Sequence, residues 1–164
     1  MRARLTVGVL LAGVATAGCG YGAKGPFRSD VETVYVEIFD SREFRRDIEF
    51  NLTEAVKKRI GVDTPYRLAP KERADTILRG ELVEERQAAF APDVRTRRPR
   101  ETQLTLVLRV EWKDQRSGEL LFEQPLLLQG VDYTPPVGES EAFAQQKAVD
   151  RLAQRIIRRM YQDW

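Results

Sequence analysis

The most regular pattern in the chain is an alternation of apolar and mostly polar residues over positions 103–112. A period of two predicts a strand with one face in a hydrophobic core. That face carries Leu104, Leu106, Leu108, Val110 and Trp112. Residues 114–118 hold Asp and Gly in turn positions and predict a hairpin into another strand over 120–131. Pro125 interrupts this strand, so we expect it to be bulged or to lie at a sheet edge.

Two earlier segments are also rich in strand-forming residues. Residues 33–39 alternate and predict the first strand, and residues 74–90 predict a second, longer one. Gly80 in the longer strand predicts a bulge or close packing. Residues 91–100 contain prolines and arginines and predict a loop. Residues 64–68 are expected to form at most a short extended piece.

Two segments have the three- and four-residue spacing of amphipathic helices. Asp40 and Ser41 are N-cap types for the first helix, and Gly61 is expected to end it. The second helix is expected to begin at 139–140, after a linker over 132–140. The predicted buried residues of the two helices are Phe44, Ile48, Leu52, Ala55, Val56 and Ile60, then Phe143, Val149, Leu152, Ala153, Ile156 and Met160.

The predicted elements follow the order β-α-β-β-β-α, and 164 residues suit one domain. A sheet with one apolar face must bury that face against other elements. We therefore predict an α+β fold, a two-layer sandwich of a four-stranded mixed or antiparallel sheet with two helices packed on one face.

The composition excludes several kinds of chemistry. The chain has no histidine and one cysteine, so it can form no Ser-His-Asp or Cys-His pair and no intramolecular disulfide. A structural zinc site would lack its usual ligands, and we expect no metal and no cofactor. Glu84 and Glu85 are adjacent and would point to opposite faces of a strand, and Asp75 is expected to end a turn. A hydrolase with paired carboxylates is therefore the weakest alternative, and we expect that the protein is not an enzyme.

The N-terminus has the layout of a secretory signal peptide. Arg2 and Arg4 precede an uncharged apolar stretch and a group of small residues. The apolar stretch is shorter than the about 20 residues that a bilayer-spanning helix needs. Thr16-Ala17-Gly18-Cys19 resembles a bacterial lipobox, so we expect cleavage before Cys19 and acylation of its thiol.

This processing divides the chain into three predicted parts. Residues 1–18 form the cleaved signal peptide, residues 19–32 a lipidated tether, and residues 33–164 a single α+β domain. Cleavage removes two arginines and no acid, so 27 − 2 = 25 basic residues face 25 acidic ones. A neutral mature chain does not favour a nucleic-acid partner. Gly20 after the cysteine resembles an address for the outer membrane, at its periplasmic face.

Several motifs of the mature chain occur together in one known family. They are Cys19-Gly20-Tyr21, Thr33-Val34-Tyr35-Val36, Phe44-Arg45-Arg46, Glu49-Phe50-Asn51-Leu52-Thr53-Glu54-Ala55, the spaced set Ala74-Asp75, Leu78 and Gly80, and Asp114 with Ser117-Gly118-Glu119. In order and spacing they resemble the LPS-assembly lipoprotein LptE family, in its divergent form from outside the enteric bacteria.

The resemblance implies a mixed sheet with two helices and a location at the inner leaflet of the outer membrane. It implies a partner, the LptD β-barrel, which such a lipoprotein plugs and helps to assemble. It also implies binding of lipopolysaccharide or a related glycolipid and assistance with its insertion into the outer leaflet. Family members are not enzymes.

An arginine cluster is the candidate binding site. Arg95, Arg97, Arg98 and Arg100 lie within one predicted loop. Guanidinium groups bind phosphate oxygens in pairs, so contact with lipid A phosphates or with the barrel is one hypothesis. A solvated loop whose charges only aid solubility is the alternative. An unrelated periplasmic lipoprotein, such as a pilotin-like scaffold or an envelope assembly factor, is the alternative function.

Overall fold

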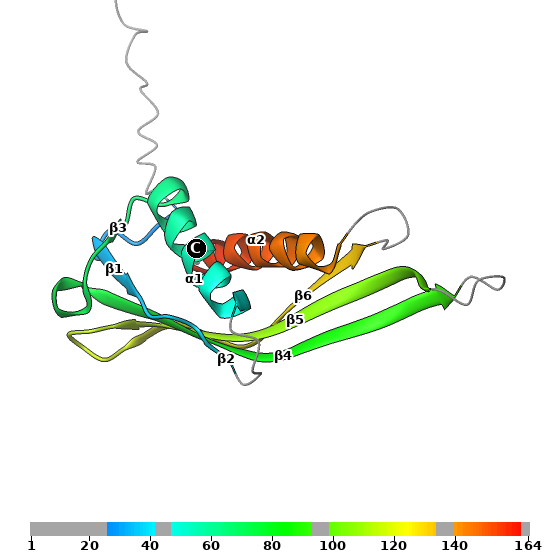
Figure 1. The fold of residues 1–164 in the computed structure, drawn as a ribbon. Helices are drawn as coiled ribbons and strands as arrows, with labels where there is room; N and C mark the ends of the chain where they lie inside the picture. Colours follow the sequence, from blue (N-terminus) through cyan, green and yellow to red (C-terminus); the bar gives the residue numbers. More distant parts are fainter. Residues whose placement is uncertain (1–25, 42–46, 93–98, 134–139, 162–164) are drawn as a thin grey trace, which may run out of the picture.

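The computed structural model describes residues 26–41, 47–92, 99–133 and 140–161 of the chain. In chain order the elements are β1 (Thr33–Val36), β2 (Asp40–Ser41), α1 (Asp47–Asp63), β3 (Arg67–Leu68), the 3₁₀-helix η1 (Lys71–Arg73), β4 (Thr76–Pro92), β5 (Pro99–Asp114), β6 (Leu120–Tyr133) and α2 (Glu141–Arg159) (Figure 1).

The described strands form one mixed sheet with the order β3-β1-β4-β5-β6, and β2 pairs with β4 beside this path. β1 runs parallel to β3 and β4, β2 runs parallel to β4, and β4, β5 and β6 are antiparallel. Both helices lie on one face of the sheet (Figure 1). The predicted α+β class is therefore confirmed. The sheet has six strands rather than four, because β2 and β3 add two residues each.

The core fills the space between the sheet and the helices. The five apolar residues predicted to face inward from β5 are each at most 1% exposed. Trp112 donates a hydrogen bond from Nε1 to Oγ1 of Thr76 at 2.9 Å, and its ring lies against those of Tyr66 and Phe122. Trp112 is thus a packing residue, as its pattern predicts, whereas Trp164 lies outside the described residues.

The first helix differs from its predicted bounds. Asp40 and Ser41 are not its N-cap but form β2, because they pair with Glu81 and Leu82 of β4. Phe44 lies outside the described residues. At the other end, α1 continues past Gly61 to Asp63. The backbone N–H and the hydroxyl of Thr64 then both donate to the Ile60 carbonyl, at 3.3 and 2.6 Å, and the helix ends there.

Gly80 makes the close packing that its place in a strand predicts. A Cβ atom at this position would lie 2.8 Å from two carbons of the Phe39 ring. Phe39 is 1% exposed, and its backbone N–H donates to Oγ1 of Thr53 in α1 at 3.1 Å. The bulge of β4 lies instead at Val83, between Leu82 and Glu84.

The predicted loop over 91–100 is shorter than expected. β4 extends to Pro92, β5 begins at Pro99, and these two prolines face each other at the end of the ladder. Proline lacks the backbone N–H donor, so it suits a position where pairing stops. At the other hairpin, Gly118 takes the positive φ of 76° that the turn requires.

Both predictions for the strand that contains Pro125 are confirmed. β6 is the edge strand on its side of the sheet, and the register with β5 shifts around Pro125. The second helix begins as predicted, because Oγ of Ser140 accepts a hydrogen bond from the Phe143 backbone N–H at 3.2 Å. Phe143 itself is 50% exposed, so its predicted burial is wrong. Ala144, one position along, is buried in its place.

Candidate functional site

Most of the site residues predicted from the sequence lie outside the part of the chain that the structure describes. Cys19, Arg95, Arg97 and Arg98 lie outside the described residues. Arg100 lies in β5, one residue after Pro99. In the sequence, Arg95, Arg97 and Arg98 fall between Pro92, where β4 ends, and Pro99, where β5 begins.

The β4–β5 hairpin is the most distinctive shape in the molecule. Its strands have 17 and 16 residues, so at about 3.4 Å per residue each is roughly 55 Å long. α2, with 19 residues at about 1.5 Å each, covers only roughly half that length. Figure 1 shows the hairpin extending beyond both helices. Residues 86–89 of β4 are exposed. Gln87 lies level with the start of α2, because its side chain donates to Glu141, the first residue of that helix, at 2.8 Å.

Asp75, the acid most open to a catalytic interpretation, has a structural role. One of its carboxylate oxygens accepts hydrogen bonds from the hydroxyl and the backbone N–H of Thr33, at 2.8 and 2.9 Å. The backbone N–H of Asp75 donates back to that hydroxyl at 2.8 Å. The Thr33 hydroxyl is the main cause that holds the pKa of Asp75 below its usual value. The carboxylate joins the start of β1 to the start of β4, which agrees with its predicted turn position.

Glu84 and Glu85 lie on opposite faces of β4, as predicted. Glu85 accepts from Gln145 of α2 at 3.4 Å, so it faces the helices. Glu84 pairs with Arg86, whose guanidinium lowers the pKa of Glu84. The two carboxylates are therefore separated by the sheet and cannot act on one substrate bond as an acid–base pair.

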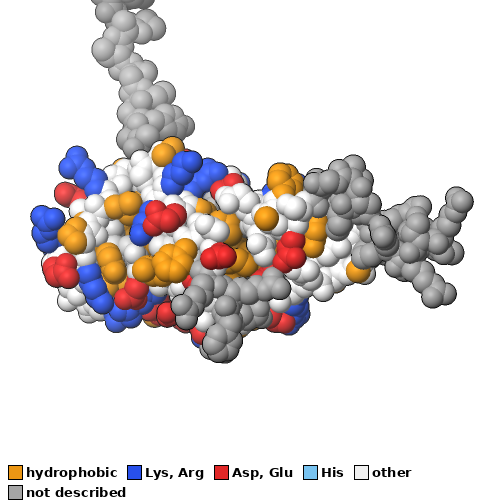
Figure 2. Space-filling view, in the orientation of Figure 1, with side chains coloured by type: hydrophobic (Ala, Val, Ile, Leu, Met, Phe, Trp, Pro, Cys, Tyr) orange, Lys and Arg blue, Asp and Glu red, His pale blue; other side chains and the backbone are white. Residues whose placement is uncertain are grey.

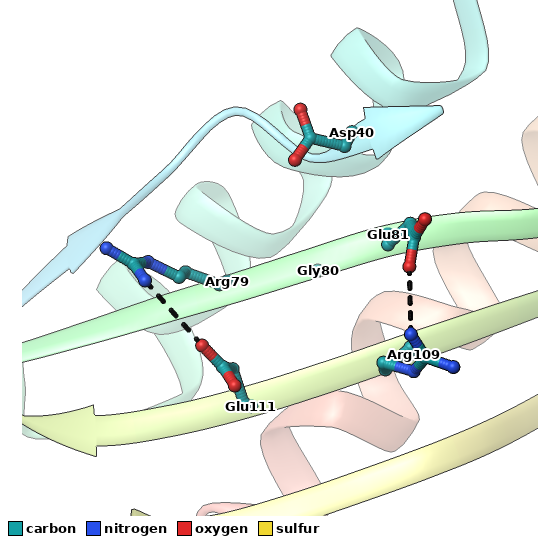
Figure 3. A pocket seen from close by; sticks show the side chains of 6 residues that line it. All are labelled: Asp40, Arg79, Gly80, Glu81, Arg109 and Glu111. Carbon is teal, nitrogen blue, oxygen red and sulfur yellow. Dashed lines mark hydrogen bonds and ion pairs between the residues drawn. The ribbon is translucent and has the colours of Figure 1, made fainter. Parts of the chain in front are cut away.

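The face of the sheet away from the helices carries a hollow of about 320 Å³ lined by Asp40, Arg79, Gly80, Glu81, Arg109 and Glu111. Figure 3 shows Arg79 reaching toward Glu111 and Arg109 toward Glu81, in both cases across the β4–β5 pair. The first pair of charged atoms is 3.8 Å apart and the second 3.2 Å. Nε of Arg79 also lies 2.7 Å from a carboxylate oxygen of Glu37.

These ion pairs determine which kind of ligand or partner the hollow can bind. Its arginines are all engaged by carboxylates, so it presents polar groups without a strong net charge. It suits contact with a polar protein surface better than capture of a highly charged ligand. The alternation around β5 predicted that Arg109 and Glu111 point outward. The partners in β4 could not be predicted, because they depend on the β4–β5 register.

Two further features are absent from the described residues: a metal-binding group and a membrane-spanning helix. They contain no group of three or more His, Cys, Asp or Glu residues that could hold a metal ion. No described helix is long and apolar enough to cross a membrane.

Comparison with known proteins identifies relatives of this fold. The family described as "LptE: Lipopolysaccharide-assembly" matches residues 31–163. Curated proteins give no match. Hypothetical protein CT253 from Chlamydia trachomatis is similar in structure, with a TM-score of 0.59, 11% identity, and coverage of 79% of this chain and 95% of that chain.

Two lipoproteins share the fold as well. Lipoprotein B from Nitrosomonas europaea has a TM-score of 0.58 and 13% identity, and the match covers 78% of this chain and 81% of that one. Rare lipoprotein B from Shewanella oneidensis has a TM-score of 0.51 and 14% identity, with coverage of 79% and 93%. At these identities the structures show the fold alone, whereas the family match spans the whole packed domain. The chain therefore belongs to the LptE lipopolysaccharide-assembly family.

Proposed function

We propose that this protein is an outer-membrane lipoprotein, anchored through acylated Cys19, that plugs and helps to assemble an LptD-type β-barrel. With that barrel it assists the insertion of lipopolysaccharide, or a related glycolipid, into the outer leaflet. The observation that carries the proposal is the family match over residues 31–163, which includes both helices and all described strands. The signal-like N-terminus and Cys19 support the location and the anchor.

The surface of the domain suits a place inside a barrel. The interior of a large outer-membrane barrel is polar. The open face of the sheet presents ion-paired arginines and carboxylates, including Arg79 with Glu37 and Arg109 with Glu81. These arginines can lie against a polar wall without being buried as unpaired cations, which would be costly. The same paired charges support a role without catalysis.

The long hairpin is the part of the domain that we assign to glycolipid contact. The sequence that connects and follows its two strands, at 93–100, contains Arg95, Arg97, Arg98 and Arg100. Forked guanidinium groups match phosphate oxygens, and lipid A carries phosphates. Changing all four arginines to alanine should weaken lipopolysaccharide binding. Changing them to lysine, which keeps the charge but loses the forked geometry, should give an intermediate loss. Unaltered binding by the alanine variant would refute this contact.

The first experiment is an affinity pull-down of the tagged protein from detergent-extracted membranes, with mass spectrometry of the bound proteins. An unrelated tagged outer-membrane lipoprotein from the same cells is the control. We expect an LptD-type barrel to co-purify with this protein in near-equal abundance. The barrel should be absent from the control. A secretin, another scaffold, or no stoichiometric partner would overturn the plug function and favour an unrelated periplasmic lipoprotein.

A further inference from the structure

The first described residues are fixed against one end of the domain. Phe27 forms an isolated antiparallel bridge with Tyr161, just after α2, and the two rings meet edge-on at 4.8 Å. The backbone N–H of Arg28 donates to the hydroxyl of Tyr66 at 2.9 Å. Val31 is 5% exposed. Residues 27–31 therefore pack on the domain, and the chain toward Cys19 leaves from this end.

Two hollows adjoin at the same place. One of about 670 Å³ is lined by Phe27, Arg28 and Arg67, among others. The other, of about 370 Å³, is lined by Arg59, Arg158 and Tyr161 and their neighbours. The contact between Phe27 and Tyr161 joins them. We call this surface the anchor end and define it by Arg28, Arg59, Val62, Arg67, Arg158 and Tyr161.

The arginines of the anchor end are not all neutralised. Arg28 pairs with Asp30 at 2.8 Å, and Arg59 pairs with Asp63 at 3.1 Å. Arg67 and Arg158 form no ion pair with any residue that the structure describes. Arg158 lies in the last turn of α2, where a cation offsets the helix dipole. Arg67 lies in a strand and has no such role.

Apolar side chains are exposed beside these charges. Val62 is 75% exposed and Tyr161 42% exposed. Val62 lines a further hollow together with Arg59, which links it to the rest of the anchor end. Figure 2 shows basic side chains next to apolar ones along this edge of the molecule, at the top of the view. Basic and aromatic groups together are typical of surfaces that lie at a lipid headgroup layer.

The length of the chain before Pro26 limits how far the anchor end can be from the membrane. Six residues lie between Cys19 and Pro26, which makes seven Cα-to-Cα steps, and a chain spans at most about 3.6 Å per step. The anchor end therefore lies within roughly 25 Å of the leaflet that holds the Cys19 acyl chains. A tether of this length allows the arginines to come within about 10 Å of the headgroups, the range over which anionic headgroups attract basic residues.

We propose that the anchor end binds the phosphate groups of anionic phospholipids in that leaflet, with Arg67 and Arg158 supplying charge and Val62 and Tyr161 entering the interface. This inference rests on the lipid anchor in the proposed function. It gives the domain a fixed orientation, with the anchor end against the membrane.

A single introduced thiol tests the contact. In the acylated protein the thiol of Cys19 is blocked, and the chain has no other cysteine. V62C can therefore be labelled alone with an environment-sensitive fluorophore, and the protein reconstituted into vesicles of phosphatidylethanolamine and phosphatidylglycerol. F143C is the matched control. Phe143 is also exposed, but along the axis of α2 it lies about 22 Å from Arg158, which belongs to the anchor end.

We expect a several-fold rise in fluorescence for V62C in these vesicles and little change for F143C. Pure phosphatidylcholine vesicles should give a smaller rise for V62C. R67E combined with R158E should abolish the rise in anionic vesicles, whereas R151E, another exposed charge reversal on α2, should leave it. No response of V62C in anionic vesicles, or a response that survives the double reversal, would overturn the contact.

Two further measurements separate this inference from the proposed function. Intact mass shows whether Cys19 is acylated, and the pull-down shows whether the barrel is bound. An acylated, barrel-bound protein without the V62C response refutes only the anchor-end contact. A protein without acylation at Cys19 refutes the anchor and this inference together.

Discussion

The contact between Gly80 and Phe39 gives the sharpest test of how the sheet and α1 are joined. Phe39 lies between β1 and β2, and its backbone is hydrogen-bonded to Thr53 of α1. A methyl group at position 80 would come within 2.8 Å of its ring, closer than real Cβ atoms approach other carbons. Because Phe39 is 1% exposed and belongs to the core cluster, its ring cannot move without disturbing the residues packed around it. G80A must therefore displace packed atoms.

The expected cost follows from two opposing effects. Overpacking a core costs about 1–3 kcal/mol, while replacing glycine by alanine within a strand gains about 0.5–1 kcal/mol. G80A should thus destabilise the domain by about 1–2 kcal/mol. G130A is the control, because its Cβ would meet only Gln103 and Thr105 atoms at 3.6 Å or more. It should stabilise the domain by about 0.5 kcal/mol.

Thermal unfolding, followed by circular dichroism, measures the difference. About 2 kcal/mol between the two variants corresponds to roughly 8 °C in Tm for a domain of this size. The penalty of G80A should disappear in an F39L background, because the ring is then absent. Equal Tm values for G80A and G130A, or a penalty that persists with F39L, would refute the explanation.

Three further predictions test other parts of the fold. D75N should cost about 1–2 kcal/mol in urea unfolding at neutral pH, because it weakens the hydrogen bonds from Thr33. The pKa of Asp75 is lowered in the folded state, so this stabilisation exists above its ordinary value of 3.8 and is lost as pH falls through the folded value. G118A should cost about 1 kcal/mol at its φ of 76°, measured in the same way. R155A should cause concentration-dependent association in analytical ultracentrifugation, because Arg155 donates to the Leu128 carbonyl on the edge strand β6.

Each of these predictions has an outcome that contradicts it. A cost for D75N that stays constant down to pH 3 would show that the carboxylate charge is not the cause. For Gly118, the same cost from G61A would contradict the role of φ, since Gly61 is exposed in a helix with nothing within 4 Å of its Cβ. R151E, which leaves the β6 carbonyl covered, should remain monomeric. If R155A stays monomeric as well, the edge is protected by something else.

The strands that depend on local pattern were predictable from the sequence, and those that depend on distant partners were not. The inward residues of β5 follow a strict period of two, and no competing pattern overlaps them. Asp40 and Ser41 are residue types that suit a helix cap, but in the structure they form the short strand β2. Only their pairing with β4, about 40 residues away, decides between them. The prolines and arginines of residues 91–100 predict a loop that is too long, because Pro92 and Pro99 still pair with each other at the end of the ladder.

In α2 only the predicted burial of Phe143 is wrong, and the reason is different. Phe143 has the right spacing to join the buried stripe of α2, but Ala144 and Ala148 occupy the positions against the sheet. Small residues allow a helix to approach its neighbours closely, and a periodicity that counts only large apolar residues misses them. Phe143 instead lies exposed, with the Lys147 ammonium 5.4 Å from its ring centre. For the candidate site, the sequence predicts the arginines and Cys19, and these stay predictions. It does not predict the ion-paired face or the anchor end, which depend on the strand register and on the packing of Phe27 against Tyr161.

The fold separates three surfaces that a barrel-associated lipoprotein would need to use at once. The anchor end lies where Phe27 meets Tyr161, the ion-paired face lies on the side of β4 and β5 away from the helices, and the hairpin extends beyond α2. β4 and β5 run from the core, where Leu78, Leu82 and the inward residues of β5 are buried, into the projecting hairpin. Changes at the hairpin end should therefore alter glycolipid binding without loosening the anchor end. The two proposed functions should therefore be separable by mutation, because the antiparallel pair of β4 and β5 lies between the surfaces assigned to them.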